Sequence, residues 1–362
     1  MLLRHLLIVG LMGTAAVTVT ACGDGNPFFE VDSDGDGVPD EDDSDDDGDG
    51  VPDEDEDDGG CAICGDPDLP PGTTEPSASG GIFRYEDIDD QGGGYVRTVS
   101  YDSVNDTFTV DNLAFDGANV YGRGVAVGTM GGYAVYEATE VEFDSVTGAP
   151  IDQFAYRAIY GVSENTTTVD GDTVPMSQFA IVRTGDYVGY GFGGFVYERN
   201  GTVTIPTTGF AQFTGTYAGL RVFQNRGGLE YTRGDVRIAV DFHDFNAGNG
   251  VRGVIYNRAA FDIDGNEIVL GDPEDEMLSL PPLVFEVGPG VMTDDGEISA
   301  GINSNAVNPD TGVLDLYESG TYYGILGGSG ANMEIVGVIV VESEDPRYST
   351  TVQETGGFIV YR

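Results

Sequence analysis

The 362-residue sequence contains no lysine and no tryptophan, and only three cysteines and two histidines. All 15 basic residues are arginines, which stand against 63 aspartates and glutamates and leave a formal net charge of -48. Nucleic acids and anionic membrane surfaces are bound through basic faces, so this composition argues against both as partners. The scarcity of cysteine and histidine leaves little material for nucleophilic or transition-metal chemistry. The 56 glycines, 19 tyrosines and 18 phenylalanines are typical of a β-rich protein with many turns.

The first residues have the organisation of an export signal. Arg4 and His5 form a short positive start, and residues 6–19 form an apolar stretch that is rich in small residues. This stretch is too short and too rich in Gly, Ala and Thr to span a membrane. We therefore predict that residues 1–21 are a signal peptide, which is cleaved.

The cleavage region ends in Val19-Thr20-Ala21-Cys22. These four residues resemble the lipobox of bacterial lipoproteins, which implies that Cys22 carries diacylglycerol and becomes the new N-terminus. Several acyl chains anchor a protein far better than one. Gly23 follows, where an aspartate would favour retention at the inner membrane, so the resemblance implies an outer-membrane location. The alternative is an ordinary signal peptide in which the cysteine occurs by chance.

An acidic tract with a repeating pattern follows the predicted anchor. Residues 22–80 contain 22 acidic residues and no basic one, and 17 of the acids lie between Asp32 and Asp58. Two segments 13 residues apart place carboxylates at positions 1, 3, 5, 9 and 12 of a calcium loop, with glycine at position 6 and valine, through its backbone carbonyl, at position 7. The predicted Ca²⁺ ligands are Asp32, Asp34, Asp36, Val38, Asp40, Asp43, Asp45, Asp47, Asp49, Val51, Asp53 and Glu56.

The two repeats, residues 32–40 and 45–53, resemble thrombospondin type 3 repeats, which implies a compact calcium-loaded stalk. Pro39 and Pro52 stand where an EF-hand would place an apolar residue, and no amphipathic helices flank the loops. We expect weak affinity, with a Kd of about 10⁻⁴ to 10⁻³ M, as in extracellular modules. The alternative is a disordered, self-repelling spacer without bound calcium.

Cys61 and Cys64 form a close pair. In an exported chain the simplest interpretation is a local disulfide. A redox motif would need a strand before the pair and a helix after it, and a zinc site would need two further ligands. The following residues, 65–80, are rich in Pro, Gly, Ser and Thr and are predicted to be a linker.

The body, residues 81–362, alternates apolar and polar residues with a period of two. Clusters of Gly, Asn and Asp separate the alternating runs, and no stretch of a dozen residues carries a helical stripe. We therefore predict an all-β body of antiparallel strands joined by hairpins. The predicted strands are 95–101, 107–110, 133–136, 179–184, 210–217, 236–242, 251–256, 321–326, 334–341 and 357–361.

Short glycine-rich segments in the last 155 residues or so carry a second resemblance. They are Phe213–Gly219, Gly234–Phe242, Val251–Arg258, Gly320–Gly324, Glu334–Val340 and Glu354–Phe358. These segments resemble the barrel of transferrin-binding protein B and of factor-H-binding-type surface lipoproteins. The resemblance implies an antiparallel eight-stranded β-barrel preceded by a β-rich handle-like subdomain. It also implies non-catalytic binding of a protein or small-molecule ligand, but no binding residue transfers.

A barrel that spans the outer membrane is the alternative to this surface module. The predicted lipid anchor would then be redundant, and the chain ends in Arg362 rather than in the usual aromatic residue. We predict a signal peptide (1–21), a lipidated cysteine with an acidic calcium-binding stalk and linker (22–80), a handle-like subdomain (81–205) and a β-barrel domain (206–362).

Signals for enzymatic chemistry are weak. Residues 189–194 match a GxGxxG pattern, but the sequence continues as a strand rather than as the helix that a dinucleotide loop needs. His243 is the only histidine outside the signal peptide, and nearby Asp241 and Asp244 could form a glycosidase-like carboxylate pair. Arg221, Arg226, Arg233 and Arg237 are expected to offset carboxylates on neighbouring strands.

The sequence therefore predicts a non-catalytic, ligand-binding lipoprotein of the outer membrane, with a calcium-binding stalk. One alternative is a structural or adhesive surface protein without a ligand pocket. A hydrolase with paired carboxylates is a second alternative. A pocket lined by aromatic and polar side chains would favour ligand binding over adhesion, whereas a close pair of carboxylates in a cleft would favour the hydrolase.

Overall fold

The computed structural model describes residues 69–362, apart from 89–91, 112, 114–118, 139–144, 149–154, 186–188, 246–247, 271–278, 288–289, 308–310 and 346. All of these residues belong to the second of the chain's two units, Gly60–Arg362. They form β-strands and one short 3-10 turn, Gly330–Asn332, so the all-β prediction is confirmed. No helix in this part of the chain is long and apolar enough to cross a membrane. The predicted anchor, calcium loops and cysteine pair lie outside the described residues.

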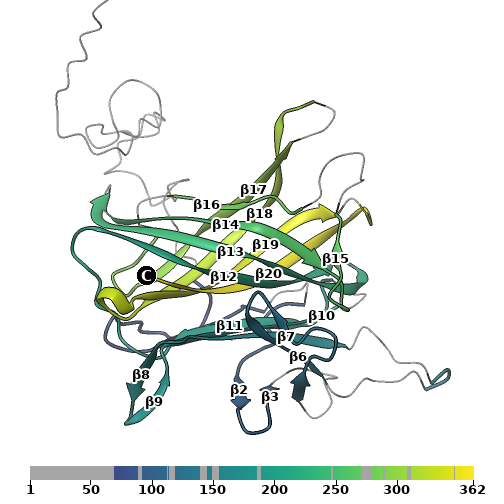
Figure 1. Cartoon of the computed structure of the whole chain (residues 1–362), viewed down its shortest axis with the longest axis horizontal. Coiled ribbons are helices and arrows are strands. Elements are labelled where there is room, and N and C mark those ends of the chain that lie inside the picture. The colour runs from purple at the N-terminus through teal and green to yellow at the C-terminus, as the bar shows by residue number, and fades with distance from the viewer. Residues whose placement is uncertain are drawn as a thin grey trace, which may run out of the picture. The chain divides into compact units, whose positions relative to one another are not determined.

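The C-terminal half forms a closed antiparallel barrel (Figure 1). Its order is β13-β12-β20-β19-β18-β17-β16-β14, and pairing between β13 and β14 closes the ring. The predicted eight-stranded barrel is therefore confirmed, and the short β15 (Glu267–Ile268) extends the sheet beyond β14. The barrel strands are β12 (Phe210–Phe223), β13 (Arg226–Phe245), β14 (Gly248–Phe261), β16 (Leu283–Phe285), β17 (Glu297–Val307), β18 (Leu314–Gly327), β19 (Glu334–Asp345) and β20 (Thr350–Tyr361).

A second antiparallel sheet, here called the first sheet, precedes the barrel in the chain. Its order is β1-β11-β10-β7-β6-β4-β3-β2, and β5 (Thr129–Met130) pairs with β6. It corresponds to the handle-like part that the family resemblance implied. Its strands are β1 (Ile82–Tyr85), β2 (Val99–Asp102), β3 (Thr107–Val110), β4 (Val120–Arg123), β6 (Tyr133–Ala138), β7 (Tyr156–Val162), β10 (Ser177–Thr184) and β11 (Gly193–Arg199). The hairpin of β8 (Thr166–Val169) and β9 (Asp172–Pro175) stands apart from it.

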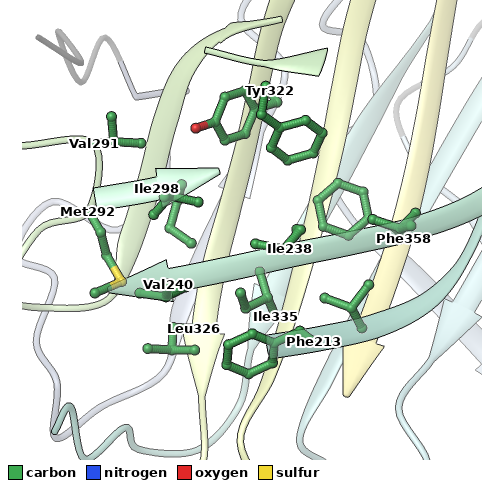
Figure 2. Packing of buried hydrophobic residues seen from close by; sticks show 14 of the residues in the cluster. Phe213, Ile238, Val240, Val291, Met292, Ile298, Tyr322, Leu326, Ile335 and Phe358 are labelled. Atoms are coloured by element: carbon green, nitrogen blue, oxygen red, sulfur yellow. The ribbon is translucent and has the colours of Figure 1, made fainter. Parts of the chain in front are cut away.

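Period-two alternation divides six of the barrel strands, β12, β13, β14, β18, β19 and β20, between two hydrophobic cores. On β12, Phe213 and Tyr217 belong to the core inside the barrel, whereas Leu220 belongs to the core between the barrel wall and the first sheet. Figure 2 shows the interior core, in which Phe213 and Phe358 lie close to side chains from several strands. Because of this alternation, one side of the barrel wall packs in the barrel interior and the other side packs against the first sheet.

One end of the barrel interior is charged rather than apolar. Arg258 donates to Glu318 at 2.6 Å and to Glu354 at 3.0 Å, and Arg221 donates to Glu230 at 2.7 Å. All five side chains are buried. Buried charges are tolerated only when they are paired and hydrogen-bonded, so this end depends on every partner being present.

The sequence predicted that four clustered arginines offset carboxylates on neighbouring strands, and one of the four does so. Arg221 does offset a carboxylate on the neighbouring strand, in the ion pair with Glu230. The other three guanidinium groups lie over aromatic rings. Arg226 lies 3.4 Å from the ring centroid of Tyr348, Arg233 lies 4.8 Å from that of Phe261, and Arg237 lies 5.8 Å from that of Tyr256.

Charged groups also join the first sheet to the barrel. Arg84 on β1 makes a bidentate pair with Glu297 on β17, at 2.6 and 2.7 Å. Arg183 on β10 donates to Thr355 on β20 at 2.8 Å. These buried contacts join the two sheets at two places.

Candidate functional site: a tyrosine-lined groove

A groove of about 500 Å³ opens where the first sheet meets the barrel. It lies where β6 begins and β7 ends, beside Gly215 and Thr216 of β12 and the last residues of β20. Five tyrosines line it, and we call it the tyrosine groove. They are Tyr101, Tyr133, Tyr136, Tyr160 and Tyr361.

Strand register brings three of these tyrosines together. Ala134 of β6 pairs with Tyr160 of β7, so the side chains of Tyr136 and Tyr160 lie on the same face of the sheet, two residues apart in register. Tyr101 on β2 completes the set, with its ring centroid 6.2 Å from that of Tyr136 and 5.7 Å from that of Tyr160. Tyr101 is 40% exposed, so its ring is accessible from solvent.

Asp106 holds one side of the groove in place. It accepts hydrogen bonds from the hydroxyls of Tyr136 at 2.9 Å and Tyr101 at 3.2 Å. Arg123 makes a bidentate pair with the same carboxylate, with both bonds at 3.0 Å. The hydrogen bonds from Arg123 and then from Tyr136 lower the pKa of Asp106, so this carboxylate stays ionised. Arg123 also lies 4.7 Å above the ring of Tyr136.

The other tyrosine hydroxyls are also engaged within the protein. The Tyr133 hydroxyl donates to the Thr216 carbonyl at 2.9 Å and accepts from the Ile359 amide at 2.8 Å. The Tyr361 hydroxyl accepts from the Glu164 amide at 3.0 Å. Burial raises the pKa of Tyr133 to about 12, so this phenol is neutral at physiological pH. What the groove offers a ligand is therefore mainly the faces of the aromatic rings.

A larger cleft of about 1050 Å³ adjoins the tyrosine groove and shares Arg123, Gly132 and Thr216 with it. Polar side chains from the β13–β14 wall line the cleft, among them Asp235 and Asn257. The Asn257 amide donates to Asp235 at 2.7 Å, which places a donor and an acceptor side by side. The two hollows form one continuous surface along the seam.

A third hollow, of about 530 Å³, lies on another part of the seam. Asp87 and Glu342 line it together with Phe195 and Tyr323. Its acidic character matches the surface as a whole, since residues 81–362 carry 41 acidic residues against 14 arginines. It has fewer aromatic side chains than the tyrosine groove, and we place the candidate site in the latter.

The structure describes part of the residues singled out for catalysis, and the side chain of Asp244 lies outside what it describes. His243 is exposed on β13, and its backbone amide donates to Asp241 at 2.9 Å. Residues 193–199 form β11, as predicted, so the GxGxxG match leads into a strand and not a helix. Glu318 and Glu354 do approach one another, but both are bound to Arg258 inside the barrel. Within the described ranges, no group of three or more metal-ligating side chains is placed to hold an ion.

Sequence reasoning did not identify the tyrosine groove. Its tyrosines come from β2, β6, β7 and β20, and 260 positions separate Tyr101 from Tyr361. The only signal was the general abundance of tyrosine, which does not distinguish core residues from those that line a groove.

Comparison with known proteins gives distant structural likenesses. No protein-family model matches the chain, and no curated protein matches it either. A crystal structure described as a surface lipoprotein is 12% identical with a TM-score of 0.29, over 54% of this chain and 79% of that one. A double mutant of transferrin binding protein B from Haemophilus parasuis is 11% identical with a TM-score of 0.32, over 74% of this chain.

A single mutant of the same H. parasuis protein is 10% identical with a TM-score of 0.26, over 73% of this chain and 66% of that one. The chain spans 46% of the length of the double mutant, less than half. We therefore base the proposed function on the residues of this chain.

Proposed function

We propose that this protein is a lipid-anchored, non-catalytic surface protein of the outer membrane that binds a ligand in the tyrosine groove. The observation that carries the proposal is the groove itself, in which five tyrosines gather at the seam between two sheets. Binding sites are typically concave, rich in aromatic side chains and supplied with a few placed polar groups. The groove has this character through its rings and the Asp106–Arg123 pair.

The groove favours ligand binding over a purely structural or adhesive role. Such a role would need no preformed hollow, whereas here hydrogen bonds hold the rings of Tyr101, Tyr133 and Tyr136 in place before any ligand arrives. Preorganised side chains lose less conformational entropy on binding. Tyr136 and Tyr160 are buried in the core of the first sheet, whereas the partly exposed rings of Tyr101, Tyr133 and Tyr361 are suited to recognise a ligand.

The test of ligand binding compares three forms of the mature protein in capture from its native medium. The wild type, a Tyr101→Ala/Tyr361→Ala double variant and a Tyr348→Ala control are immobilised, and the retained molecules are identified by mass spectrometry. Tyr348 is a matched control because it is 39% exposed, close to the 40% of Tyr101, and precedes β20 at the end opposite Tyr361. We expect a molecule that the wild type and the control retain and the double variant loses. Equal capture by all three forms contradicts the proposal.

The anchor and the stalk are separate parts of the proposal. A diacylglycerol on Cys22 predicts an N-terminal peptide with the added mass of fatty acyl groups, which a Cys22→Ser variant lacks.

Ca²⁺ bound by the two repeats between Asp32 and Glu56 predicts that heat is released or absorbed when the mature protein is titrated with calcium. Replacing Asp32 and Asp45, the ligands at position 1 of each loop, by Ala should remove most of that heat, because each loop loses a carboxylate that its geometry requires. Identical titrations would leave the tract as a spacer.

A further inference from the structure

An ion pair borders the tyrosine groove, which Arg123 lines. Arg123 and Asp106 neutralise one another through two hydrogen bonds of 3.0 Å. The Arg123 guanidinium also lies over Tyr136, so the groove already fills the position that a cationic ligand group would take on this ring. Glu164, the other charged residue that lines the groove, is exposed to solvent, where charges interact weakly. A ligand therefore gains little here from carrying a net charge.

Three of the five rings, those of Tyr101, Tyr133 and Tyr361, are at least partly exposed and remain available to a ligand. The hydroxyls of Tyr101 and Tyr133 are held by Asp106 and by the barrel backbone, which fixes the ring planes. The face of an aromatic ring carries partial negative charge and attracts weakly polarised C–H bonds. The flat C–H faces of a sugar ring match such a surface in shape and polarity.

The adjoining cleft supplies the polar, hydrogen-bonding groups that the aromatic rings lack. Asp235 and Asn257 present an acceptor and an amide side by side, and Arg233 and Asp264 line the same cleft. A sugar hydroxyl is both a donor and an acceptor, so it is well served by such mixed groups. Because the cleft shares Arg123 and Thr216 with the groove, one oligomeric ligand can extend through both hollows.

We infer that the tyrosine groove and its adjoining cleft bind a neutral glycan, whose sugar rings stack on Tyr101 and Tyr361 and whose hydroxyls bind in the cleft. This inference deepens the proposed function and rests on it. A basic peptide, which the acidic surface would attract from a distance, is the competing ligand class. The two classes differ in their response to salt, because screening weakens only the binding of the peptide.

The experiment titrates the mature protein with maltoheptaose, cellopentaose, chitopentaose, mannopentaose and linear dextran, and with nona-arginine as the basic probe. Tyrosine fluorescence reports binding directly, since the chain has no tryptophan. Each titration is made at about 0.05 M and about 0.5 M NaCl. We expect at least one neutral sugar to bind with the same Kd, within about twofold, at both salt concentrations.

The variants connect that binding to the groove. We expect Tyr101→Ala and Tyr361→Ala each to weaken sugar binding by about tenfold, because each removes a stacking face. The Tyr348→Ala control should bind like the wild type, and circular dichroism verifies that all three variants fold.

Two results overturn the inference. Failure of every sugar to bind rejects the glycan class, and the proposed function then depends on the capture experiment alone. Binding of nona-arginine only, lost at high salt and in the groove variants, also rejects the glycan class but supports a ligand site in the groove.

Discussion

Arg258 and Glu354 form an ion pair inside the barrel, with Nη2 of Arg258 3.0 Å from Oε2 of Glu354 and neither side chain more than 2% exposed. The other oxygen of Glu354 accepts hydrogen bonds from Tyr217 at 2.6 Å and Thr232 at 2.9 Å. Four strands, β12, β13, β14 and β20, are thus connected through a single carboxylate. The charged end of the barrel is therefore a closed network rather than a set of separate pairs.

Replacing one member of this network should destabilise the protein strongly. In Glu354→Gln the Arg258 guanidinium keeps its pair with Glu318, but one of the two carboxylate oxygens of residue 354 becomes an NH2 group, which cannot accept the hydrogen bonds that this oxygen received. A buried donor that loses its acceptor typically costs about 1 to 3 kcal/mol of unfolding free energy, and more when the donor is charged. Urea unfolding followed by circular dichroism measures this loss. Asp106→Asn is the control, because the Asp106–Arg123 pair is solvent-exposed and its loss should cost far less.

A loss below about 1 kcal/mol for Glu354→Gln would contradict the prediction, since it would mean that Glu318 alone satisfies Arg258 and that Tyr217 and Thr232 do not need the carboxylate. An equal loss of stability in Glu354→Gln and Asp106→Asn would also contradict the prediction, because burial would then have no influence on the strength of the ion pairs.

The same carboxylate predicts how stability depends on pH. Burial alone would raise the pKa of Glu354, but the Arg258 and Arg221 guanidinium groups outweigh it and lower the pKa of this carboxyl. A group whose pKa is lowered by folding contributes stability above its unfolded pKa, about 4.3 for glutamate, and loses it as the pH falls toward the folded value. We expect the unfolding free energy to fall steeply below about pH 4.5, and to fall less steeply in Glu354→Gln. Urea midpoints measured from pH 7 down to about pH 3 provide the test, and parallel curves for the two proteins would reject it.

A close approach inside the barrel explains one glycine. A Cβ built on Gly356 of β20 would lie 2.0 Å from the Tyr217 hydroxyl oxygen and 2.1 Å from the ring carbon that carries it. We expect Gly356→Ala to destabilise the protein by about 3 kcal/mol or more, because the ring is buried and cannot move aside. Thermal unfolding measures the effect. At Gly80 a Cβ meets no atom within 4 Å, so Gly80→Ala should stay within about 0.5 kcal/mol of the wild type. Similar losses in the two variants would show that Tyr217 does not require the glycine.

The sequence predicted the barrel better than it predicted the groove, for a physical reason. Alternation along one strand decides which residues are buried, so runs such as 334–341 predicted β19 directly. The pairing of Arg221 with Glu230 follows from the short β12–β13 hairpin, in which nine positions separate the two residues. The pairing of Arg258 with Glu354 spans 96 positions and depends on how the barrel closes. No local pattern encodes that closure, and the same holds for the tyrosine groove.

The predicted linker shows a similar limit. Its composition predicted that residues 65–80 are a linker, and the described residues of this segment contact the body. Ala78 packs against the interior core and its amide donates to Asp295 at 3.1 Å. Arg199, whose partners in this segment are backbone carbonyls of Ser77 and Gly80 at 2.8 Å each, holds the segment in place. Amino-acid composition describes side chains, so it cannot predict hydrogen bonds that are made by backbone carbonyls.

Arg199 should therefore control the accessibility of this segment. It also donates to the carbonyls of Asp295 and Leu326, at 2.8 Å each, and burial lowers its pKa to about 10. In Arg199→Met these carbonyls lose their donor. We expect residues 74–81 to exchange amide hydrogens at least about tenfold faster in the variant, because local opening becomes easier. Hydrogen exchange with mass spectrometry measures the change.

The matched control for this experiment is Arg362→Met, which removes an exposed arginine that donates to the Gly330 carbonyl at 3.0 Å. Exchange in residues 74–81 should be unchanged in the control. Unchanged exchange in Arg199→Met as well would mean that other contacts, such as that of Ala78, are sufficient to hold the segment.

The charge of the body predicts a dependence on salt that is opposite to that of most ion-paired proteins. Residues 81–362 carry 41 acidic residues and 14 arginines, a net charge of -27. Several of the arginines are buried in pairs that salt screens poorly, Arg183 and Arg258 among them, so added salt acts mainly on repulsion between surface carboxylates. We expect the melting temperature to rise as NaCl is increased from about 0.05 M to about 1 M, over which the screening length falls to about 3 Å. Differential scanning calorimetry of the mature protein, with KCl as a second salt to separate screening from specific ion binding, provides the measurement. A melting temperature that stays constant or falls in both salts would show that the surface charges are too well spaced to repel one another.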